Sequence, residues 1–120
     1  MSEFKPVPVK PVVTFSAFEV LDIRVGTIQK IEEVSQSKKL MKLTVGFGDH
    51  TRVILAGIKQ ERGNPQEIEG KQALFVLNLE PRKMAGEVSE GMLFDIGYAD
   101  GITPVLAMPE RNVPDGTRAG

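Results

Sequence analysis

Short segments in which apolar and polar residues alternate constrain the fold of this chain more than any other feature. In LDIRVG (residues 21–26) and MKLTVGF (41–47) every second residue is apolar, which is the period of a strand with one buried face. Further apolar segments at 51–56, 72–79, 92–98 and 103–108 are bounded by glycine, proline or asparagine. These segments predict a chain that consists mainly of strands.

The connections between these strands indicate a barrel. Gly26 stands where the first alternation breaks before Ile28 and Ile31, and a glycine there predicts a bulge or sharp coil in a long first strand. Gly48-Asp49-His50 predicts a hairpin turn between strands two and three. Residues 57–70 are rich in helix and strand breakers and leave room for one short helix.

Five strands, a kinked first strand and a helical insert between strands three and four together predict an all-β Greek-key barrel of the OB-fold. An SH3-like barrel would give a similar pattern. The expected domain spans residues 15–120, with N- and C-terminal extensions that flank the barrel.

The first fourteen residues differ in composition from the rest of the chain. Pro6, Pro8 and Pro11 exclude a helix and favour an extended arm. Thr14 or Ser16 is a candidate cap for a short helical turn that follows. We therefore predict a proline-rich arm over 1–14.

Composition excludes several classes of function. The 120 residues include no cysteine, which rules out disulfides, zinc-thiolate sites and thiol catalysis. His50 is the only histidine and lies in a predicted turn, so we expect neither a metal site nor a catalytic triad. No paired carboxylates or activated nucleophile can be assembled, and we expect a protein without cofactor that is not an enzyme. No apolar run could span a bilayer and no signal peptide is recognisable, so we expect a cytoplasmic protein without membrane contact.

Charge is distributed unevenly along a chain whose net charge is −1. Between positions 38 and 62 six cations stand against two acids, whereas acids dominate from position 84 onward. This asymmetry indicates a specific basic patch rather than a general affinity for polyanions. An ordinary solvated strand face is the alternative.

The segment NLEPRKMAGEVSEGM (residues 78–92) is the strongest functional signal. It follows the apolar run 73–77, which reads as a buried strand. Pro81 fixes its own φ and extends the residue before it, so Arg82 and Lys83 leave the sheet in a defined direction into an exposed loop. A cationic loop tip with a polar return at Ser89 and Glu90 suits a surface that binds an anionic ligand.

Four blocks carry a family resemblance: LDIRVG (21–26), SKKLMKL (37–43), AGI (56–58) and the residues NL, PRKM and SEGM within 78–92. In this order they closely resemble the tRNA-binding domain appended to many methionyl-tRNA synthetases. That domain also occurs in small dimeric tRNA-binding proteins, in relatives that resemble secretion chaperones and in a cytokine. The resemblance covers the chain from about Phe15 to the C-terminus.

The resemblance implies an OB-fold that recognises tRNA by its shape and forms a homodimer. The dimer would form through the flanking segments 15–21 and 104–116, although these segments could instead cover the barrel edge within one subunit. Because no catalytic synthetase portion is present, the chain resembles a free-standing member that acts alone or in trans with an aminoacyl-tRNA synthetase.

The resemblance also implies a set of tRNA-binding residues: Lys38, Lys39, Lys42, Asn78, Arg82, Lys83, Met84, Ser89, Glu90 and Met92. The cations would meet phosphates, Asn78, Ser89 and Glu90 would bond to bases or ribose, and the two methionines would pack on a base. Arg52 and Lys59 are weaker candidates.

Several of these residues have a structural alternative. Asn78 could bond only to backbone, Glu90 could pair with Arg82 or Lys83, and Met92 could belong to the core. Phe47, Phe75 and Phe94 lie in apolar runs and are expected in the core. Few aromatic residues then remain for stacking, which favours recognition of a folded RNA over capture of a single strand.

A peptide-binding chaperone associated with secretion is the alternative function. Its relatives share the C-terminal pattern Val113-Pro114-Asp115-Gly116-Thr117, and an apolar groove would have to come from Met84, Ala85 and Val88. The basic segment SKKLMKL resembles the tRNA-binding branch of the family better, and for this reason we favour tRNA binding over peptide binding.

Overall fold

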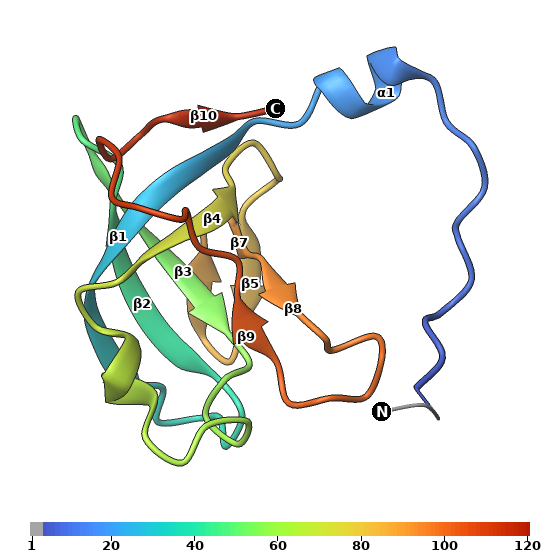
Figure 1. The fold of residues 1–120 in the computed structure, drawn as a ribbon. Coiled ribbons are helices and arrows are strands. Elements are labelled where there is room, and N and C mark those ends of the chain that lie inside the picture. The colour runs from blue at the N-terminus through green and yellow to red at the C-terminus, as the bar shows by residue number, and fades with distance from the viewer. Residues whose placement is uncertain (1–3) are drawn as a thin grey trace.

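The computed structural model describes residues 4–120 (Figure 1). Its elements in chain order are α1 (Phe15–Glu19), β1 (Ile23–Glu33), β2 (Met41–Gly46), β3 (Thr51–Ala56), the 3-10 helix η1 (Pro65–Ile68), β4 (Gln72–Val76), β5 (Arg82–Met84), β6 (Glu87–Ser89), β7 (Met92–Leu93), β8 (Asp95–Ile96), β9 (Val105–Leu106) and β10 (Arg118–Ala119). The part of the chain so described contains no helix long and apolar enough to cross a membrane.

The main sheet has the antiparallel order β3-β2-β1-β4-β7 and is nearly closed into a barrel (Figure 1). The long β1 pairs with β4 through residues 23–27 and with β2 through residues 27–33, so one strand serves two sides of the barrel. At the remaining gap, the Glu90 N–H donates to the Val53 carbonyl at 2.8 Å. The predicted all-β OB-fold with a helical insert between the third and fourth strands is confirmed.

The core lies inside this barrel. Phe75, Ile28, Leu43 and Ile54 are fully buried, and the Phe47 ring meets the Phe75 ring edge-on at a centroid distance of 5.5 Å. Phe47 and Phe75 therefore occupy the core as predicted. Phe94 is only half-buried and lines a surface hollow instead.

Gly26 serves close packing rather than the predicted bulge. A Cβ at position 26 would lie 2.6 Å from Cε1 of Phe47, so only glycine lets this ring approach β1. The register between β1 and β2 shifts between Ile28 and Lys30, which makes Gln29 the irregular position. The predicted turn at 48–50 is present, because the Phe47 N–H donates to the His50 carbonyl at 2.9 Å.

The predicted exposed loop after Pro81 is in fact a β-hairpin. β5 pairs with β6, and Ala85 and Gly86 form the turn with φ values of 50° and 83°. Positive φ at both central residues is the geometry of a two-residue type I′ turn. The hairpin gives Arg82 and Lys83 fixed and opposite orientations that an irregular loop would not.

The predicted fifth strand over 92–98 is divided between two sheets. β7 pairs with β4, whereas β8 pairs with β9 in a separate two-stranded sheet. The division follows Phe94, whose N–H makes the last bond to β4 at the Leu74 carbonyl, 3.1 Å away.

The N-terminal segment leaves the barrel. Thr14 caps α1, with its Oγ1 accepting from the Ala17 N–H at 3.2 Å, and α1 contains no buried residue. Residues 4–13 form no regular secondary structure, are exposed and arc away from the barrel (Figure 1), and the Val7 N–H reaches Asp100 Oδ1 at 3.2 Å. The first three residues of the predicted arm lie outside the described part.

Candidate functional site

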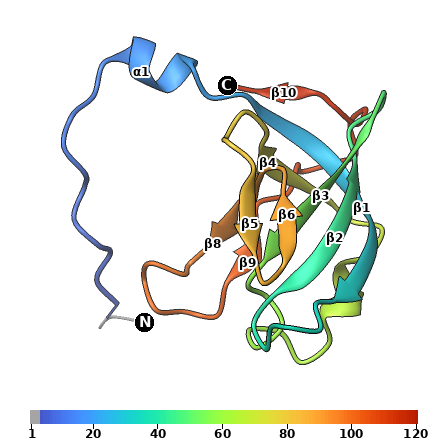
Figure 2. The same cartoon turned by 180° about the vertical axis from the view of Figure 1, so that it is seen from behind.

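The β5–β6 hairpin lies beside β2 and the connection between β1 and β2. Lys42 Nζ of β2 is 3.5 Å from Glu87 Oε1 of β6, and a Cβ at Gly86 would lie 3.2 Å from Gln36 Oε1 in the connection. Figure 2 shows the hairpin on the side of the barrel formed by β2 and β3. Two segments about fifty residues apart in sequence therefore form one surface.

Four exposed cations lie in these two segments, Lys38 and Lys39 in the connection between β1 and β2 and Arg82 and Lys83 on β5. Within residues 4–120 none of them has an ion-pair partner. Ser37 orders the first pair, since its Oγ accepts from the Lys39 N–H at 3.1 Å and from the Leu40 N–H at 3.0 Å. We call these four residues the cationic surface.

Two further predicted cations are already neutralised. Lys42 pairs with Glu87, and Lys59 pairs with Glu33. The Lys59 ammonium lowers the pKa of Glu33 through a hydrogen bond. Lys42 still borders the cationic surface, whereas Lys59 is occupied by its acid partner.

The pairing register of the hairpin decides which way its side chains point. Arg82 stands opposite Ser89, and Lys83 stands opposite Val88. Cross-strand partners share a face of a sheet, and Ser89 is buried against the barrel. Arg82 therefore lies on the barrel side of the hairpin, with Met84 two residues on, and Lys83 points to solvent.

A pocket of about 150 Å³ opens on the barrel side of the hairpin. Its lining consists of Leu55, Leu79, Glu80, Arg82, Met84, Ser89, Gly91 and Met92. The structure thus brings together four of the predicted residues, namely Arg82, Met84, Ser89 and Met92. Met92, for which a core position was the alternative, has 44% of its surface exposed.

Ser89 and Glu90 bond to β3 and not to a neighbouring charge. Ser89 Oγ accepts from the Leu55 N–H and donates to the Gly91 carbonyl, both at 3.0 Å. Glu90 Oε1 accepts from the Val53 N–H at 2.9 Å. The alternative that Glu90 pairs with Arg82 or Lys83 is wrong, because residues 4–120 contain no such pair.

Asn78 does not line the pocket beneath the hairpin but lines a separate hollow together with Asp22 and Arg118. Its Oδ1 accepts from the Asp22 N–H at 2.7 Å, and its Nδ2 donates to the Val20 carbonyl at 2.6 Å. Both bonds go to backbone groups, which is the arrangement of the structural alternative for Asn78. This amide attaches the end of β4 to the segment that leads from α1 into β1.

Arg52 links three parts of the barrel. Its Nη1 donates to the Leu77 carbonyl at 2.9 Å and to the Glu90 carbonyl at 3.1 Å, and its Nε donates to His50 Nε2 at 3.1 Å. His50 then carries its proton on Nδ1, 2.6 Å from Asp49 Oδ1, and this hydrogen bond lowers the pKa of Asp49. The sequence offered no signal for this network, because its carbonyl partners are up to 38 residues away.

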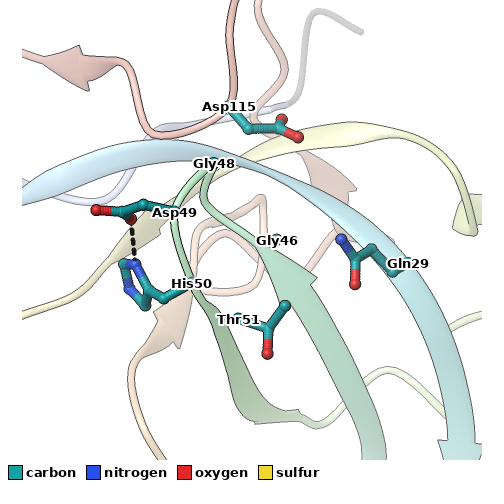
Figure 3. Close-up of a pocket in the computed structure, with 7 residues that line it drawn as sticks. All are labelled: Gln29, Gly46, Gly48, Asp49, His50, Thr51 and Asp115. Carbon is teal, nitrogen blue, oxygen red and sulfur yellow. Dashed lines mark hydrogen bonds and ion pairs between the residues drawn. The ribbon is translucent and has the colours of Figure 1, made fainter.

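A second hollow, of about 310 Å³, lies at the β2–β3 turn (Figure 3). Its lining is polar and contains Gln29, Gly46, Gly48, Asp49, His50, Thr51 and Asp115. Asp115 Oδ1 already accepts from Thr27 and Gln72 at 2.7 and 2.9 Å. With two acids and no lysine or arginine in its lining, this hollow does not suit an anionic ligand.

Acidic groups with shifted pKa values lie elsewhere on the barrel. A hydrogen bond from Arg24 lowers the pKa of Asp22, with Arg118 adding to it. Burial raises the pKa of Asp95, and burial together with the nearby Asp95 raises the pKa of Glu61. None of these groups lines the pocket beneath the hairpin.

The two segments flanking the barrel differ in their packing. The C-terminal segment lies on β1, since the Gly116 N–H donates to the Val25 carbonyl at 2.7 Å and β10 pairs with Ile23 and Arg24. By contrast, Phe15 on α1 is 71% exposed. Beside α1 is an apolar hollow of about 180 Å³ lined by Phe18, Ile23, Leu74, Phe94, Ala107, Ala119 and Gly120.

Residues 23–118 match the family described as "Putative tRNA binding domain". The methionine–tRNA ligase of Phocaeicola vulgatus is 44% identical over 108 residues, which cover 89% of this chain and 16% of that ligase. The ligase of Archaeoglobus fulgidus is 41% identical over 109 residues, which cover 91% of this chain and 16% of the ligase. The chain thus spans about a sixth of the length of these relatives.

Two solved structures are similar over their full length. A MetRS-related protein from Pyrococcus horikoshii superposes with a TM-score of 0.84 at 34% identity, covering 92% of this chain and all of that one. The chaperone CsaA from Bacillus anthracis superposes with a TM-score of 0.79 at 29% identity, also over 92% of this chain and all of its own.

Proposed function

This chain belongs to the tRNA-binding domain family, and we propose that it is a non-catalytic module that binds folded tRNA through its cationic surface. The proposal is supported by four exposed cations on two adjacent segments, Lys38, Lys39, Arg82 and Lys83, none of which has an acidic partner in residues 4–120. Each cation that meets a phosphate releases counterions and adds a salt-dependent increment to affinity. Arg82 can also hold a phosphate with two parallel hydrogen bonds.

Recognition rests on the backbone and shape of the RNA. In residues 4–120 the exposed aromatic side chains are Phe4, Phe15, Phe18 and Tyr98, and none of them lies on the hairpin or on the β1–β2 connection. Proteins that capture single strands stack successive bases on aromatic rings. The cationic surface has no such platform.

The remaining predicted residues divide by their contacts. Lys42 joins the RNA contacts by exchanging Glu87 for a phosphate, whereas Lys59 stays with Glu33. The bonds described above show how four residues position the hairpin and the strand ends, and we propose no phosphate contact for them: Ser89, Glu90, Asn78 and Arg52. Met84 and Met92 line the pocket beneath the hairpin.

We propose an aminoacyl-tRNA synthetase as the enzyme that this module serves. Its similarity to about a sixth of the length of methionine–tRNA ligases supports this assignment. A module that holds tRNA and is also attached to a synthetase raises the local concentration of the tRNA substrate at that enzyme.

We propose that two copies of the chain form a dimer through α1 and the apolar hollow beside it. Phe15 and Phe18 are exposed, and the hollow presents almost only apolar side chains. Contiguous exposed apolar surface of this kind marks an interaction site.

Phe18→Asp is expected to convert a dimer at micromolar concentration into a monomer in sedimentation experiments. Val88→Asp, which changes a similarly exposed residue on the hairpin, should leave the dimer intact. A wild-type monomer at that concentration contradicts the dimer.

A salt titration of binding to bulk folded tRNA, with an unstructured peptide as competitor, tests the main proposal. Affinity should fall steeply with salt and should ignore the peptide. The double variant Arg82→Ala/Lys83→Ala should fold normally and lose about 2 units of the slope of log K against log salt, at about 0.9 per phosphate contact.

The control is Lys5→Ala/Lys10→Ala, which removes the same charge from the exposed arm. This variant should keep the slope of the wild type. An unchanged slope in a folded Arg82→Ala/Lys83→Ala variant would contradict the cationic surface as the site.

A peptide-binding chaperone is the second candidate, supported by the similarity to the chaperone CsaA and by the apolar walls of the pocket beneath the hairpin. Weak tRNA binding that is insensitive to salt, together with measurable affinity for the peptide, would favour this function.

A further inference from the structure

We propose that the pocket beneath the β5–β6 hairpin receives a single unstacked nucleobase of the bound RNA. This inference rests on the proposed tRNA-binding function and adds a base contact to the phosphate contacts of the cationic surface. The pocket is about 150 Å³, well below the roughly 300–1,000 Å³ of sites for drug-sized ligands. It therefore suits one ring system and excludes a base pair.

The walls of the pocket are apolar and their outer parts are accessible. Leu79 and Met92 are 41% and 44% exposed at the mouth, Met84 is half-buried, and Leu55 is buried at the base. Thioether and aliphatic groups pack well against the face of a flat ring. A base in this position would be held between Leu79, Met84 and Met92.

The floor of the pocket is rigid before any ligand arrives. Ser89 Oγ bonds on both sides, to the Leu55 N–H and to the Gly91 carbonyl. Gly91 lets the chain pass close to β4, because a Cβ there would lie 2.8 Å from the Val76 carbonyl oxygen. A preformed site avoids the cost of ordering on binding.

The polar groups at the rim suit a nucleotide. Arg82 lines the pocket and has no acidic partner in residues 4–120, so it can bind the phosphate attached to the inserted base. The Glu80 carboxylate is exposed at the same rim and can accept from an exocyclic amino group. An anion beside a flat apolar group describes a nucleotide better than an apolar peptide side chain.

In residues 4–120 no exposed phenylalanine or tyrosine lines the pocket, which agrees with insertion of one base. A folded RNA presents its unstacked bases at bulges, loops and ends, and these are the bases that proteins can take up. One pocket next to four cations would then read the position of a single exposed base on a folded RNA.

The test uses the full chain and two stem-loop RNAs that contain the fluorescent base 2-aminopurine. In one RNA this base is bulged, and in the other it is paired within the stem. Uptake of the bulged base removes its stacking neighbours, so its fluorescence should rise on binding, whereas the fluorescence of the paired probe should stay unchanged.

Two variants remove a wall of the pocket. Met92→Ala and Leu79→Ala should each abolish the fluorescence rise and weaken binding of the bulged RNA about fivefold, because each removes apolar surface that would pack on the base. Neither should weaken binding of the paired RNA. The matched control is Met108→Ala, since Met108 is 49% exposed and lines a different hollow.

The outcomes separate this inference from the function on which it rests. If both RNAs bind equally and Met92→Ala and Leu79→Ala change nothing, the base pocket is refuted, while a salt slope that depends on Arg82 and Lys83 preserves tRNA binding. If neither RNA binds in a salt-dependent way, the proposed function fails first. If an apolar peptide displaces the probe signal and loses affinity in Met92→Ala, the pocket binds peptide side chains and the inference is overturned.

Discussion

Arg52 is expected to stabilise the barrel rather than to bind RNA, and Arg52→Ala tests this directly. The guanidinium holds the carbonyls of Leu77 and Glu90 at 2.9 and 3.1 Å. Hydrogen bonds to a charged group contribute about 1.5–3 kcal/mol each, and half-burial of the arginine places both at or below the low end of that range. The expected loss is about 2 kcal/mol of the free energy of unfolding.

Urea unfolding measures this loss as a lower midpoint at unchanged m-value. In a chain of this length about 2 kcal/mol corresponds to a melting temperature lower by about 8 °C. Arg52→Lys keeps the charge but should recover only part of the loss, because an ammonium does not reproduce the planar fork that meets two carbonyls. Lys30→Ala, which breaks an exposed pair with Glu32 at 3.5 Å, should change little.

The reasoning is refuted by a specific pattern. If Arg52→Ala unfolds at the urea concentration of the wild type but binds tRNA with a smaller salt slope, Arg52 is a phosphate contact. The carbonyl bonds would then contribute nothing measurable to the fold.

Three further predictions concern the pH dependence of stability and the packing of the backbone. Burial raises the pKa of Asp95 above 3.8, so the folded state loses stability as this carboxyl group ionises with rising pH. Asp95→Asn should therefore raise the melting temperature at pH 7, and this gain should disappear near pH 3. The ionised Asp22 carboxylate stabilises the fold instead, because a hydrogen bond from Arg24 lowers its pKa below 3.8. Asp22→Asn should therefore lower the melting temperature at pH 7, and the difference from the wild type should shrink as the pH falls through the lowered pKa. Gly26→Ala places a Cβ 2.6 Å from the ring of a core phenylalanine and should lower the free energy of unfolding in urea by about 1–3 kcal/mol. Gly57→Ala should change this free energy little, because nothing lies within 4 Å of the added Cβ. Equal effects of the two substitutions would contradict the packing role of Gly26.

The barrel was predictable because its main strands bury one face each. The alternation of apolar and polar residues over 41–47 can be seen directly in the sequence. The short helical insert was predicted because residues 57–70 are rich in residues that break helices and strands. The β5–β6 hairpin was missed because three-residue strands are too short to show a period. The turn also places Ala85 at a φ of 50°, and an alanine in a sequence does not predict a left-handed backbone conformation.

The exposure of the cations could be predicted for a different reason. Charge is read directly from the sequence, and Pro81 marks the point where the chain leaves a buried strand. The polar residues of the same motif were assigned to RNA because nothing local shows their partners. Asn78, Glu90 and Ser89 bond to backbone 56, 37 and 34 residues away, and only the closed barrel brings these groups together.

This division of the motif determines how its variants should be read. A residue that positions the hairpin acts on RNA affinity only through the fraction of molecules in which the hairpin lies on β3. For a closure favoured by more than about 4 kcal/mol, the loss of about 2 kcal/mol leaves about 97% of molecules closed, and the apparent affinity barely changes. Substitution of Arg52 or Glu90 should therefore lower stability at nearly constant affinity, whereas substitution of Arg82 or Lys83 should lower affinity at constant stability. Under the proposed function, polar residues of the motif that hold the hairpin on β3 matter as much as the cations, because the cations on β5 are useful only where β3 holds the hairpin.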